Sequence, residues 1–336
     1  MASMLNNKYK ILVTGAYGFI GSALVERVEK QWGAESLTLA VRHVHKHRRD
    51  LNTFSLGTFN SETDWSKALN DCNVVIHSAG RAHFKKQNRN EDYSESLLED
   101  YHSSMQLANS AVRAGVERFI FISSVLAQGS MSITPFKECD IPTPDTPAGK
   151  VKLEIEKGLL EIGEKSGMEI VIIRSSLVYG RNAPGNFGHL VSLLERQVPL
   201  PLGLVKNKRS LIGIDNLVDL VMICIVHQKA ANQIINAADG EDLSTTELLT
   251  SIASAMGKKC YLVPVPSTLI RCAALLIGKK NQVDKLISSL QVDISKARDE
   301  LGWVPRFSIK SGLGKCFIAS KENEIKSDNT KKREQL

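Results

Sequence analysis

The chain has 336 residues, of which 43% are hydrophobic and 24% are charged, and its formal net charge is +7. A chain of this length and composition can bury a sizeable core, in one large domain or in two joined ones. No basic stripe interleaved with aromatic residues runs along a predicted helix, so nucleic acid is not expected as a partner. Anionic small molecules, such as dinucleotides and sugar diphosphates, account for the positive charge at least as well.

The six cysteines are scattered and form no CxxC pair. This spacing argues against a disulfide framework or a structural zinc site and favours a reducing compartment. The first residues lack the apolar core of a signal peptide, and no apolar run approaches the ~18 residues that span a bilayer. We therefore expect a cytoplasmic protein without stable membrane insertion.

From residue 10 onward, short apolar runs alternate with amphipathic stretches, a pattern typical of βαβ units and a parallel sheet. Between the third and fourth expected strands, apolar residues recur at helical spacing from Leu97 to Val112, and Ala114-Gly115 closes this helix. The expected buried strands are Ile11–Thr14, Leu37–Val41, Val74–His77, Phe119–Ser123 and Ile170–Arg174.

The sequence changes character after about residue 180, where prolines and glycines mark irregular loops between shorter elements. Ile234–Ala237 is expected to return to the main sheet as a later strand. Ser267–Gly278 is an apolar helix interrupted by Arg271, and a core helix of a smaller lobe is favoured over a helix that grazes a membrane. Residues 322–336 are polar and are expected to form a disordered tail.

These elements predict an α/β fold with a Rossmann-type doubly wound parallel sheet. The sheet is expected within residues 9–179. Residues 180–318 are expected to form mainly a smaller C-terminal α/β lobe that binds the substrate.

A glycine-rich turn, Gly15-Ala16-Tyr17-Gly18-Phe19-Ile20-Gly21, lies directly after the first strand and opens a helix. Small residues let the chain turn tightly and bring the N–H groups of a helix N-terminus against a pyrophosphate. Because the preceding strand, the following helix and the βαβ pattern are all present, this turn predicts a dinucleotide site. The alternative is a plain turn between strand and helix.

The end of the second strand decides between NAD and NADP. In the standard dinucleotide fold an acidic residue binds the adenosine ribose at this point. Here the strand ends Ala40-Val41-Arg42, and the first carboxylate comes only at Asp50. Arg42 suits the 2′-phosphate of NADP, because a guanidinium binds phosphate in bidentate fashion. NADP(H) is therefore favoured and NAD(H) remains possible.

The basic stretch after Arg42 leaves two further interpretations open. Its basic residues are His43, Lys46, Arg48 and Arg49, and they form a solvated loop if no phosphate binds there. The alternation of His43, His45 and His47 is not expected to bind a metal ion, because its neighbours are basic and no carboxylate accompanies it.

Beyond the glycine turn, residues 9–318 resemble the extended short-chain dehydrogenase/reductases, the nucleotide-sugar epimerase/dehydratase group. The stretch from Val74 through Ser78-Ala79-Gly80 looks like the strand that passes close to the cofactor ribose and diphosphate. Phe119–Ser124 resembles the strand that ends at the catalytic Ser/Thr, a role that falls on Ser124, with Ser123 beside the cofactor. The segment from Arg174 to Gly180 resembles the one that lines the nicotinamide, with Leu177 in contact. Asp100 stands where the family commonly has Asn.

Segments of the second lobe narrow the resemblance to a bacterial surface-polysaccharide subgroup, whose members are usually UDP-sugar 4-epimerases or 4-reductases that make 6-deoxy-N-acetylhexosamines. The likeness implies that Asn186 and Arg209 hold the substrate diphosphate, that Leu200 lies by the uracil and that Arg81 contacts the substrate. The segments that carry it are 185–187, 199–203, 208–211, 215–219, 289–293 and 301–303.

The family hallmark is Tyr-x-x-x-Lys on one helix face, where the lysine lowers the pKa of the phenol and the phenol exchanges a proton with the substrate. Lys152 stands at the lysine position, but Ala148 stands at the tyrosine position. Three explanations remain open: an introduced substitution that traps substrate, a natural alanine with Ser124, Lys152 or water supplying the proton, or a chain that has lost its chemistry. In each case the chain as written is expected to be weak or inactive in the standard reaction. A solvated Lys152 is the alternative for that residue.

Three functions follow from these features. The leading hypothesis is an NADPH-linked reductase of a 4-keto UDP-sugar, in particular a UDP-4-keto-6-deoxy-N-acetylhexosamine of O-antigen or capsule biosynthesis. The first alternative is a UDP-glucose or UDP-N-acetylglucosamine 4-epimerase, which would keep NAD tightly bound. The second is a non-catalytic NAD(P)-binding sensor. Dimerisation is common in the family, so a homodimer is a possible assembly.

Overall fold

The computed structural model describes residues 9–43, 51–57, 59–80, 93–276, 278 and 280–317. The chain divides into two compact units. Unit 1 comprises Met1–Ser176, Leu217–Ala238 and Val292–Val304, and unit 2 comprises Leu177–Asn216, Asp239–Gln291 and Pro305–Leu336. The tail expected at residues 322–336 lies outside the described residues. Within the described ranges, no helix is both long enough and apolar enough to cross a bilayer.

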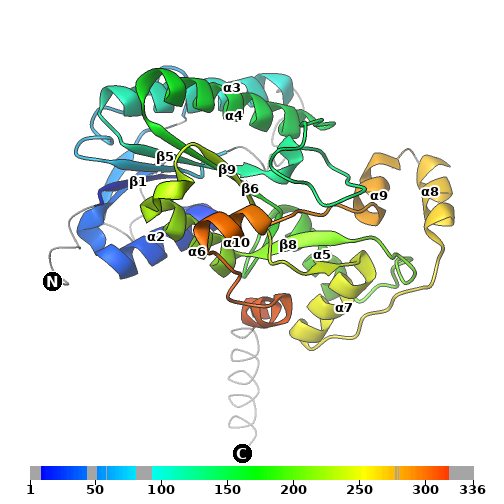
Figure 1. The fold of residues 1–336 in the computed structure, drawn as a ribbon. Coiled ribbons are helices and arrows are strands. Elements are labelled where there is room, and N and C mark those ends of the chain that lie inside the picture. Colours follow the sequence, from blue (N-terminus) through cyan, green and yellow to red (C-terminus); the bar gives the residue numbers. More distant parts are fainter. Residues whose placement is uncertain are drawn as a thin grey trace, which may run out of the picture. The chain divides into compact units, whose positions relative to one another are not determined.

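Unit 1 is built on a seven-stranded parallel sheet with the strand order β3-β2-β1-β4-β5-β6-β9 (Figure 1). The predicted fold class is thereby confirmed. Successive strands are added to one side of β1 as far as β3 and then to its other side from β4 onward. Ligands of such sheets bind beyond the carboxyl ends of the strands at this switch point. The strands are β1 (Ile11–Thr14), β2 (Leu37–Val41), β3 (Asn52–Ser55), β4 (Val74–His77), β5 (Arg118–Ser124), β6 (Glu169–Ser175) and β9 (Gln233–Ala237).

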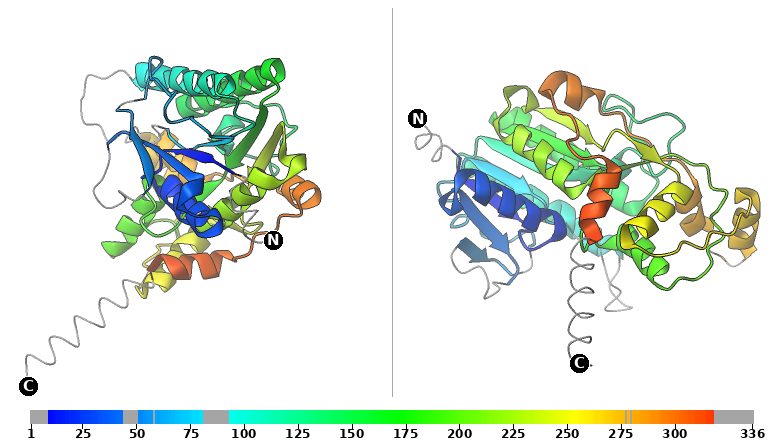
Figure 2. Two further views of the ribbon diagram at one scale, coloured as in Figure 1. Left: turned by 90° about the vertical axis from the view of Figure 1, so that its left-hand side faces the viewer. Right: turned by 90° about the horizontal axis from the view of Figure 1, so that it is seen from below.

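Helices cover both faces of this sheet. Helices α3 and α4 lie side by side over one face, as the two rotated views also show (Figure 2). The helices of this unit are α2 (Phe19–Trp32), α3 (Tyr93–Arg113), α4 (Pro147–Ser166), most of α6 (Ile214–Val226) and α10 (Ser295–Leu301), with the short 3₁₀ helices η1 (Ala34–Ser36), η3 (Val125–Ala127) and η4 (Gln228–Ala230). Helices α6 and α10 and strand β9 thus belong to unit 1, although their residues lie within the range 180–318 that was predicted to form mainly the second lobe.

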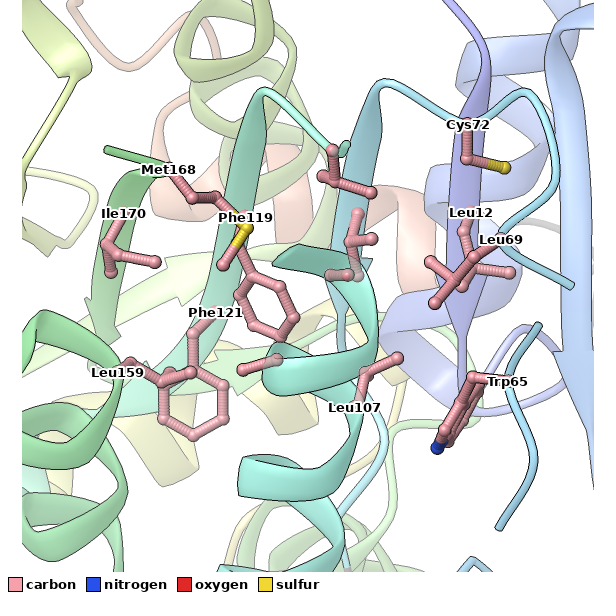
Figure 3. Packing of buried hydrophobic residues seen from close by; sticks show 14 of the residues in the cluster. Leu12, Trp65, Leu69, Cys72, Leu107, Phe119, Phe121, Leu159, Met168 and Ile170 are labelled. Carbon is pink, nitrogen blue, oxygen red and sulfur yellow. The ribbon is translucent and has the colours of Figure 1, made fainter. Parts of the chain in front are cut away.

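The core of unit 1 lies between the sheet and the α3–α4 pair (Figure 3). Phe119 and Phe121 project from β5 towards Leu107 of α3 and Leu159 of α4, and all four side chains are fully buried. Burying an aliphatic or aromatic side chain of this size contributes about 1.5–3 kcal/mol. The contacts fix how α4 lies across the end of β5, and α4 carries the candidate catalytic lysine.

Unit 2 contains a three-stranded sheet in the order β10-β8-β7, in which β7 and β8 are parallel and β10 is antiparallel. Buried polar groups hold it together: the Tyr179 hydroxyl donates to Asp239 over 2.7 Å, and the Asn216 amide donates to the same carboxylate over 2.7 Å. The strands are β7 (Leu177–Tyr179), β8 (Arg209–Gly213) and β10 (Asp242–Leu243). The helices include α5 (Gly185–Glu195), α7 (Thr245–Met256), α8 (Ser267–Leu276) and α9 (Lys280–Ile287), and residues 309–317 are also helical.

Candidate cofactor and catalytic site

The glycine turn follows β1 at the carboxyl edge of the sheet, and two of its positions leave no room for a side chain. Gly15 has a left-handed φ of +67°, and a Cβ there would come within 2.9 Å of the Ala79 backbone. A Cβ on Gly21 would collide with the carbonyl oxygen of Gly15. The backbone of β4's end can therefore approach the turn closely, and α2 can begin directly behind it.

Helix α2 begins at this turn without a side-chain cap. Its N-cap is Gly18, whose N–H donates to the Gly15 carbonyl over 2.8 Å. The first N–H groups of a helix lack intrahelical partners, and the helix dipole adds partial positive charge at the same end. The first turn carries no acidic residue that would compete for these groups. This cradle of open backbone donors fits the bridging phosphates of a dinucleotide.

The ends of β1 and β4 are tied together by a buried polar network. The Thr14 hydroxyl lies 2.7 Å from Nδ1 of His77, and Nε2 of the same ring lies 3.0 Å from the Ser104 hydroxyl on α3. The Ser78 hydroxyl donates to the Thr14 carbonyl over 2.7 Å, and the Ala79 N–H donates to the Thr14 hydroxyl over 3.3 Å. These bonds hold the Ser78–Gly80 segment against the glycine turn.

His77 is neutral in this network. Burial, together with the charge of Lys152, lowers its pKa from 6.5 to about 3. Its ring stacks on Phe121 with centroids 5.6 Å apart. The sequence pattern places His77 at the end of a strand and indicates no role for it in the site. The available signal was a polar residue at the end of an apolar strand, directly before small residues.

Lys152 of α4 reaches the same edge of the sheet. Its ammonium nitrogen lies 4.4 Å from the centroid of the Phe121 ring, and a Cβ on Gly80 would lie 3.5 Å from it. Burial lowers the pKa of Lys152, although the charges of Asp100 and Glu156 oppose the shift. The structure therefore brings Lys152 beside the Ser78–Gly80 segment, rather than leaving it on a solvated helix face.

Ser124 ends β5 and caps η3, where its Oγ accepts the N–H of Leu126 over 3.3 Å. The 3₁₀ helix packs tightly on the first turn of α4, because a Cβ on Gly149 would collide with the Leu126 carbonyl oxygen. Ala148 lies next to Gly149 in that turn and is partly exposed. Its methyl group has no proton to donate.

Two tyrosines with described side chains lie away from this turn. Tyr101 of α3 is next to Gly158, further along α4 than Lys152. Tyr179 belongs to unit 2, where burial and the Asp239 carboxylate raise the pKa of its phenol. Neither of them takes the place of a tyrosine at position 148.

A buried ion pair lies one helical turn beyond Lys152. Glu156 receives hydrogen bonds from Arg174 of β6 at 2.7 Å and 3.1 Å, and both side chains are almost fully buried. The Ser123 hydroxyl donates to the same carboxylate over 2.5 Å, so it points into this pair. Glu156 was not predicted from the sequence. Its spacing of four residues from Lys152 was the only available signal.

The remaining cofactor candidate, Arg42, directly follows β2. It is exposed, and its carbonyl accepts the Ser55 hydroxyl of β3 over 3.0 Å. The other basic residues of that loop lie outside the described residues, namely Lys46, Arg48 and Arg49, as do His45, His47 and the candidate substrate residue Arg81.

Four candidates lie in unit 2. Leu177 begins β7, Asn186 is exposed in the first turn of α5, and Leu200 lies in an extended segment that pairs with Leu262. The guanidinium of Arg209 at the start of β8 donates to the carbonyls of Lys285 and Ser288 over 2.7 Å and 3.2 Å. Burial lowers its pKa. Arg209 is thus already held by the end of α9.

The arrangement of these elements agrees with a match to a known family. The model of the NAD dependent epimerase/dehydratase family matches residues 11–238. The chain belongs to this family. The resemblance stated from the motifs is confirmed, and the cofactor of the family is NAD.

Members of the family with known names cover nearly the whole chain. A UDP-glucose 4-epimerase of Vibrio cholerae is 39% identical over 314 residues, covering 90% of this chain and 93% of that protein. A dTDP-4-dehydro-6-deoxyglucose reductase of Escherichia coli is 26% identical and covers 92% of this chain and 97% of that protein. The relatives of this chain therefore include both an epimerase and a reductase.

Solved structures share its fold. The UDP-N-acetylglucosamine 4-epimerase from Bacillus cereus has a TM-score of 0.76 at 19% identity and covers 94% of this chain and all of that one. The UDP-glucuronic acid 4-epimerase from Bacillus cereus in complex with NAD has a TM-score of 0.74 at 23% identity, covering 91% of this chain and 95% of that one. At these identities the likeness concerns the fold alone.

Proposed function

We propose that the chain is a nucleotide-sugar oxidoreductase that exchanges a hydride between C4 of a UDP-hexose and a nicotinamide dinucleotide. The observation that carries this proposal is the position of Lys152, buried against Phe121 and Gly80 beside the glycine turn. Unit 1 binds the dinucleotide in this proposal, and unit 2 binds the nucleotide sugar through Asn186, Leu200 and Arg209.

Residues of unit 1 hold the cofactor at defined atoms. The amides of the Gly15–Gly21 turn bind the bridging phosphates, and the Ser78–Gly80 segment lines the adjoining ribose and diphosphate. Lys152 donates to the nicotinamide ribose. When bound, the nicotinamide ring supplies or accepts the hydride.

The site lacks the side chain that would normally transfer the proton. A tyrosine at position 148 would exchange the proton of the sugar hydroxyl, and Ala148 cannot do so. Ser124 can orient the substrate oxygen through its hydroxyl. Lys152 holds a proton whose pKa is lowered by burial, and it can deliver that proton directly or through water. With alanine at position 148, turnover by this chain is therefore slow.

Two reactions share this hydride exchange. Arg42 at the end of β2 supports a 4-reductase that uses NADPH, in particular one acting on a UDP-4-keto-6-deoxy-N-acetylhexosamine in surface-polysaccharide assembly. The relative from Vibrio cholerae supports a UDP-sugar 4-epimerase that retains NAD. A 4-epimerase returns the hydride to the sugar, whereas a 4-reductase consumes one NADPH for every sugar.

The Ala148→Tyr variant distinguishes these reactions. It is incubated with UDP-glucose or UDP-N-acetylglucosamine plus NAD, and separately with a 4-keto-6-deoxy UDP-sugar plus NADPH. Epimer formation without net change in NADH absorbance identifies the epimerase, and stoichiometric loss of NADPH identifies the reductase. If the variant binds the dinucleotide but converts neither substrate, the oxidoreductase proposal is wrong and a binding module remains.

A further inference from the structure

Helix α8 packs with α9 in unit 2 (Figure 1). Its inward residues Ile270 and Ala274 are buried, whereas Leu269 is 60% exposed and Leu276 is 87% exposed. The outward residues recur at i, i+3, i+4 and i+7, which places them on one side of the helix. They are Leu269, Cys272, Ala273 and Leu276, and all four are exposed.

The exposed apolar surface continues beyond this side of the helix. Leu275 is 63% exposed, and Tyr261 and Val263, in the segment that leads into α8, are 48% and 44% exposed. That segment is held in place by backbone pairing, because the Leu200 N–H donates to the Tyr261 carbonyl and the Val263 N–H donates to the Leu200 carbonyl. We call Tyr261, Val263, Leu269, Leu275 and Leu276 the α8 patch.

The sequence around the α8 patch holds more basic than acidic residues. Residues 248–283 contain no Asp or Glu, although a stretch of this length would hold about four at the average frequency of the chain. Lys258 and Lys259 are exposed, and Arg271 is half exposed while it pairs with Asp284 over 3.1 Å. The basic residues of the stretch are Lys258, Lys259, Arg271, Lys279 and Lys280.

We propose that the α8 patch lies on the surface of a bilayer that contains anionic phospholipids. An exposed apolar helix face bordered by basic residues has the composition of a helix that lies in the membrane interface. A second copy of the chain is a poorer occupant, because a two-fold contact would set the same basic residues against each other. The proposal concerns lipid binding alone and does not rest on the proposed reaction.

Vesicle sedimentation tests this surface with the full chain. The protein is expected to sediment with vesicles of phosphatidylglycerol mixed equally with phosphatidylcholine, to stay in solution with phosphatidylcholine alone, and to be released by high salt. Each basic residue near an anionic surface raises partitioning roughly fivefold, so K258Q/K259Q is expected to lower the partition coefficient about 25-fold. L269E/L276E is expected to abolish binding and to leave the circular dichroism spectrum unchanged.

A matched control separates this patch from general surface hydrophobicity. Ile133 of unit 1 is fully exposed, and Ile133→Glu is expected to sediment like the unaltered chain. The proposal is overturned if L269E/L276E still sediments with the mixed vesicles, if Ile133→Glu releases the protein, or if the chain binds neither kind of vesicle. It is equally overturned if L269E/L276E changes only the oligomeric state on gel filtration.

Discussion

The first turns of α2 and α4 differ in what their function depends on. At the start of α2 the proposed binding groups are backbone N–H donors, and the sequence needs only the absence of side chains at Gly15, Gly18 and Gly21. At the start of α4 the backbone is equally well placed, capped by Thr146 and packed on η3, but the reacting group has to be a side chain. In the proposed reaction, the alanine at position 148 takes away the phenol that would exchange the proton, and it leaves the Gly15–Gly21 turn unchanged.

The largest effect is expected from restoring the missing phenol. Ala148→Tyr should raise kcat by about 10²–10⁴-fold, because it returns a positioned acid/base group beside Lys152. The affinity for the dinucleotide should stay the same, since the α2 turn is untouched. Initial rates and cofactor titrations measure both quantities. Ala148→Phe, which fills the same space without a hydroxyl, should remain as slow as the unaltered chain; equal rates for all three proteins would contradict this account of α4.

A second effect concerns the side chains that hold α4 in place. Glu156→Gln leaves the buried Arg174 guanidinium without a full counter-charge, and breaking such a pair costs about 3–5 kcal/mol of the free energy of unfolding. Urea denaturation measures this loss. Glu154→Gln, which breaks the exposed pair with Lys157, should change stability by less than about 1 kcal/mol. Similar values for the two variants would show that the Glu156–Arg174 pair does not fix the helix.

A site made of backbone groups can be predicted from the sequence more easily than a site made of side chains. The α2 turn was predictable because the spacing of its glycines indicates the positions at which no side chain fits. The roles of His77, Ser104 and Glu156 were missed, since they depend on contacts among β1, β4, β6, α3 and α4 between residues that lie 18 to 63 positions apart in the chain. Tertiary contacts of this kind leave no local pattern.

The fold shows the same limits. Strand β3 was not predicted, because Asn52, Thr53 and Ser55 are polar and only partly covered at the edge of the sheet. The return of α6 and α10 to unit 1 was also not predicted, since a helix shows in its sequence that one face is buried but not against which unit. The central strands were predicted because they are apolar and buried on both faces.

A third and smaller effect concerns Arg42 at the end of β2, which is proposed to bind the 2′-phosphate of NADPH. Arg42→Ser should weaken NADPH binding about 10- to 100-fold, the value of a charge-assisted hydrogen bond to phosphate, and should leave NADH binding unchanged. Fluorescence titration with both cofactors measures the ratio. Lys157→Ser removes an exposed charge of α4 and serves as the control. Equal losses for NADH and NADPH would exclude a contact with the 2′-phosphate.

The smallest effect is a pH dependence that comes from the polar network under the turn. The folded-state pKa of His77 is depressed to about 3, so the unfolded chain binds a proton near pH 6.5 while the folded chain does not. The stabilisation is present above pH 6.5 and is lost as the pH falls towards 3. Between pH 7.5 and 5.5 the free energy of unfolding should drop by about 1.4 kcal/mol because of this group. His77→Asn should lack that part of the slope, and an unchanged slope would contradict a buried neutral imidazole.

Binding of NADH and NADPH to the unaltered chain tests most directly that the α2 turn works independently of Ala148. Equilibrium fluorescence titration should give saturable binding of at least one of them, with the same Kd in Ala148→Tyr. Gly21→Val should abolish binding, because its Cβ would displace the Gly15 carbonyl. Absence of binding in the unaltered chain, or undiminished binding in a folded Gly21→Val variant, would contradict a backbone-built cofactor site.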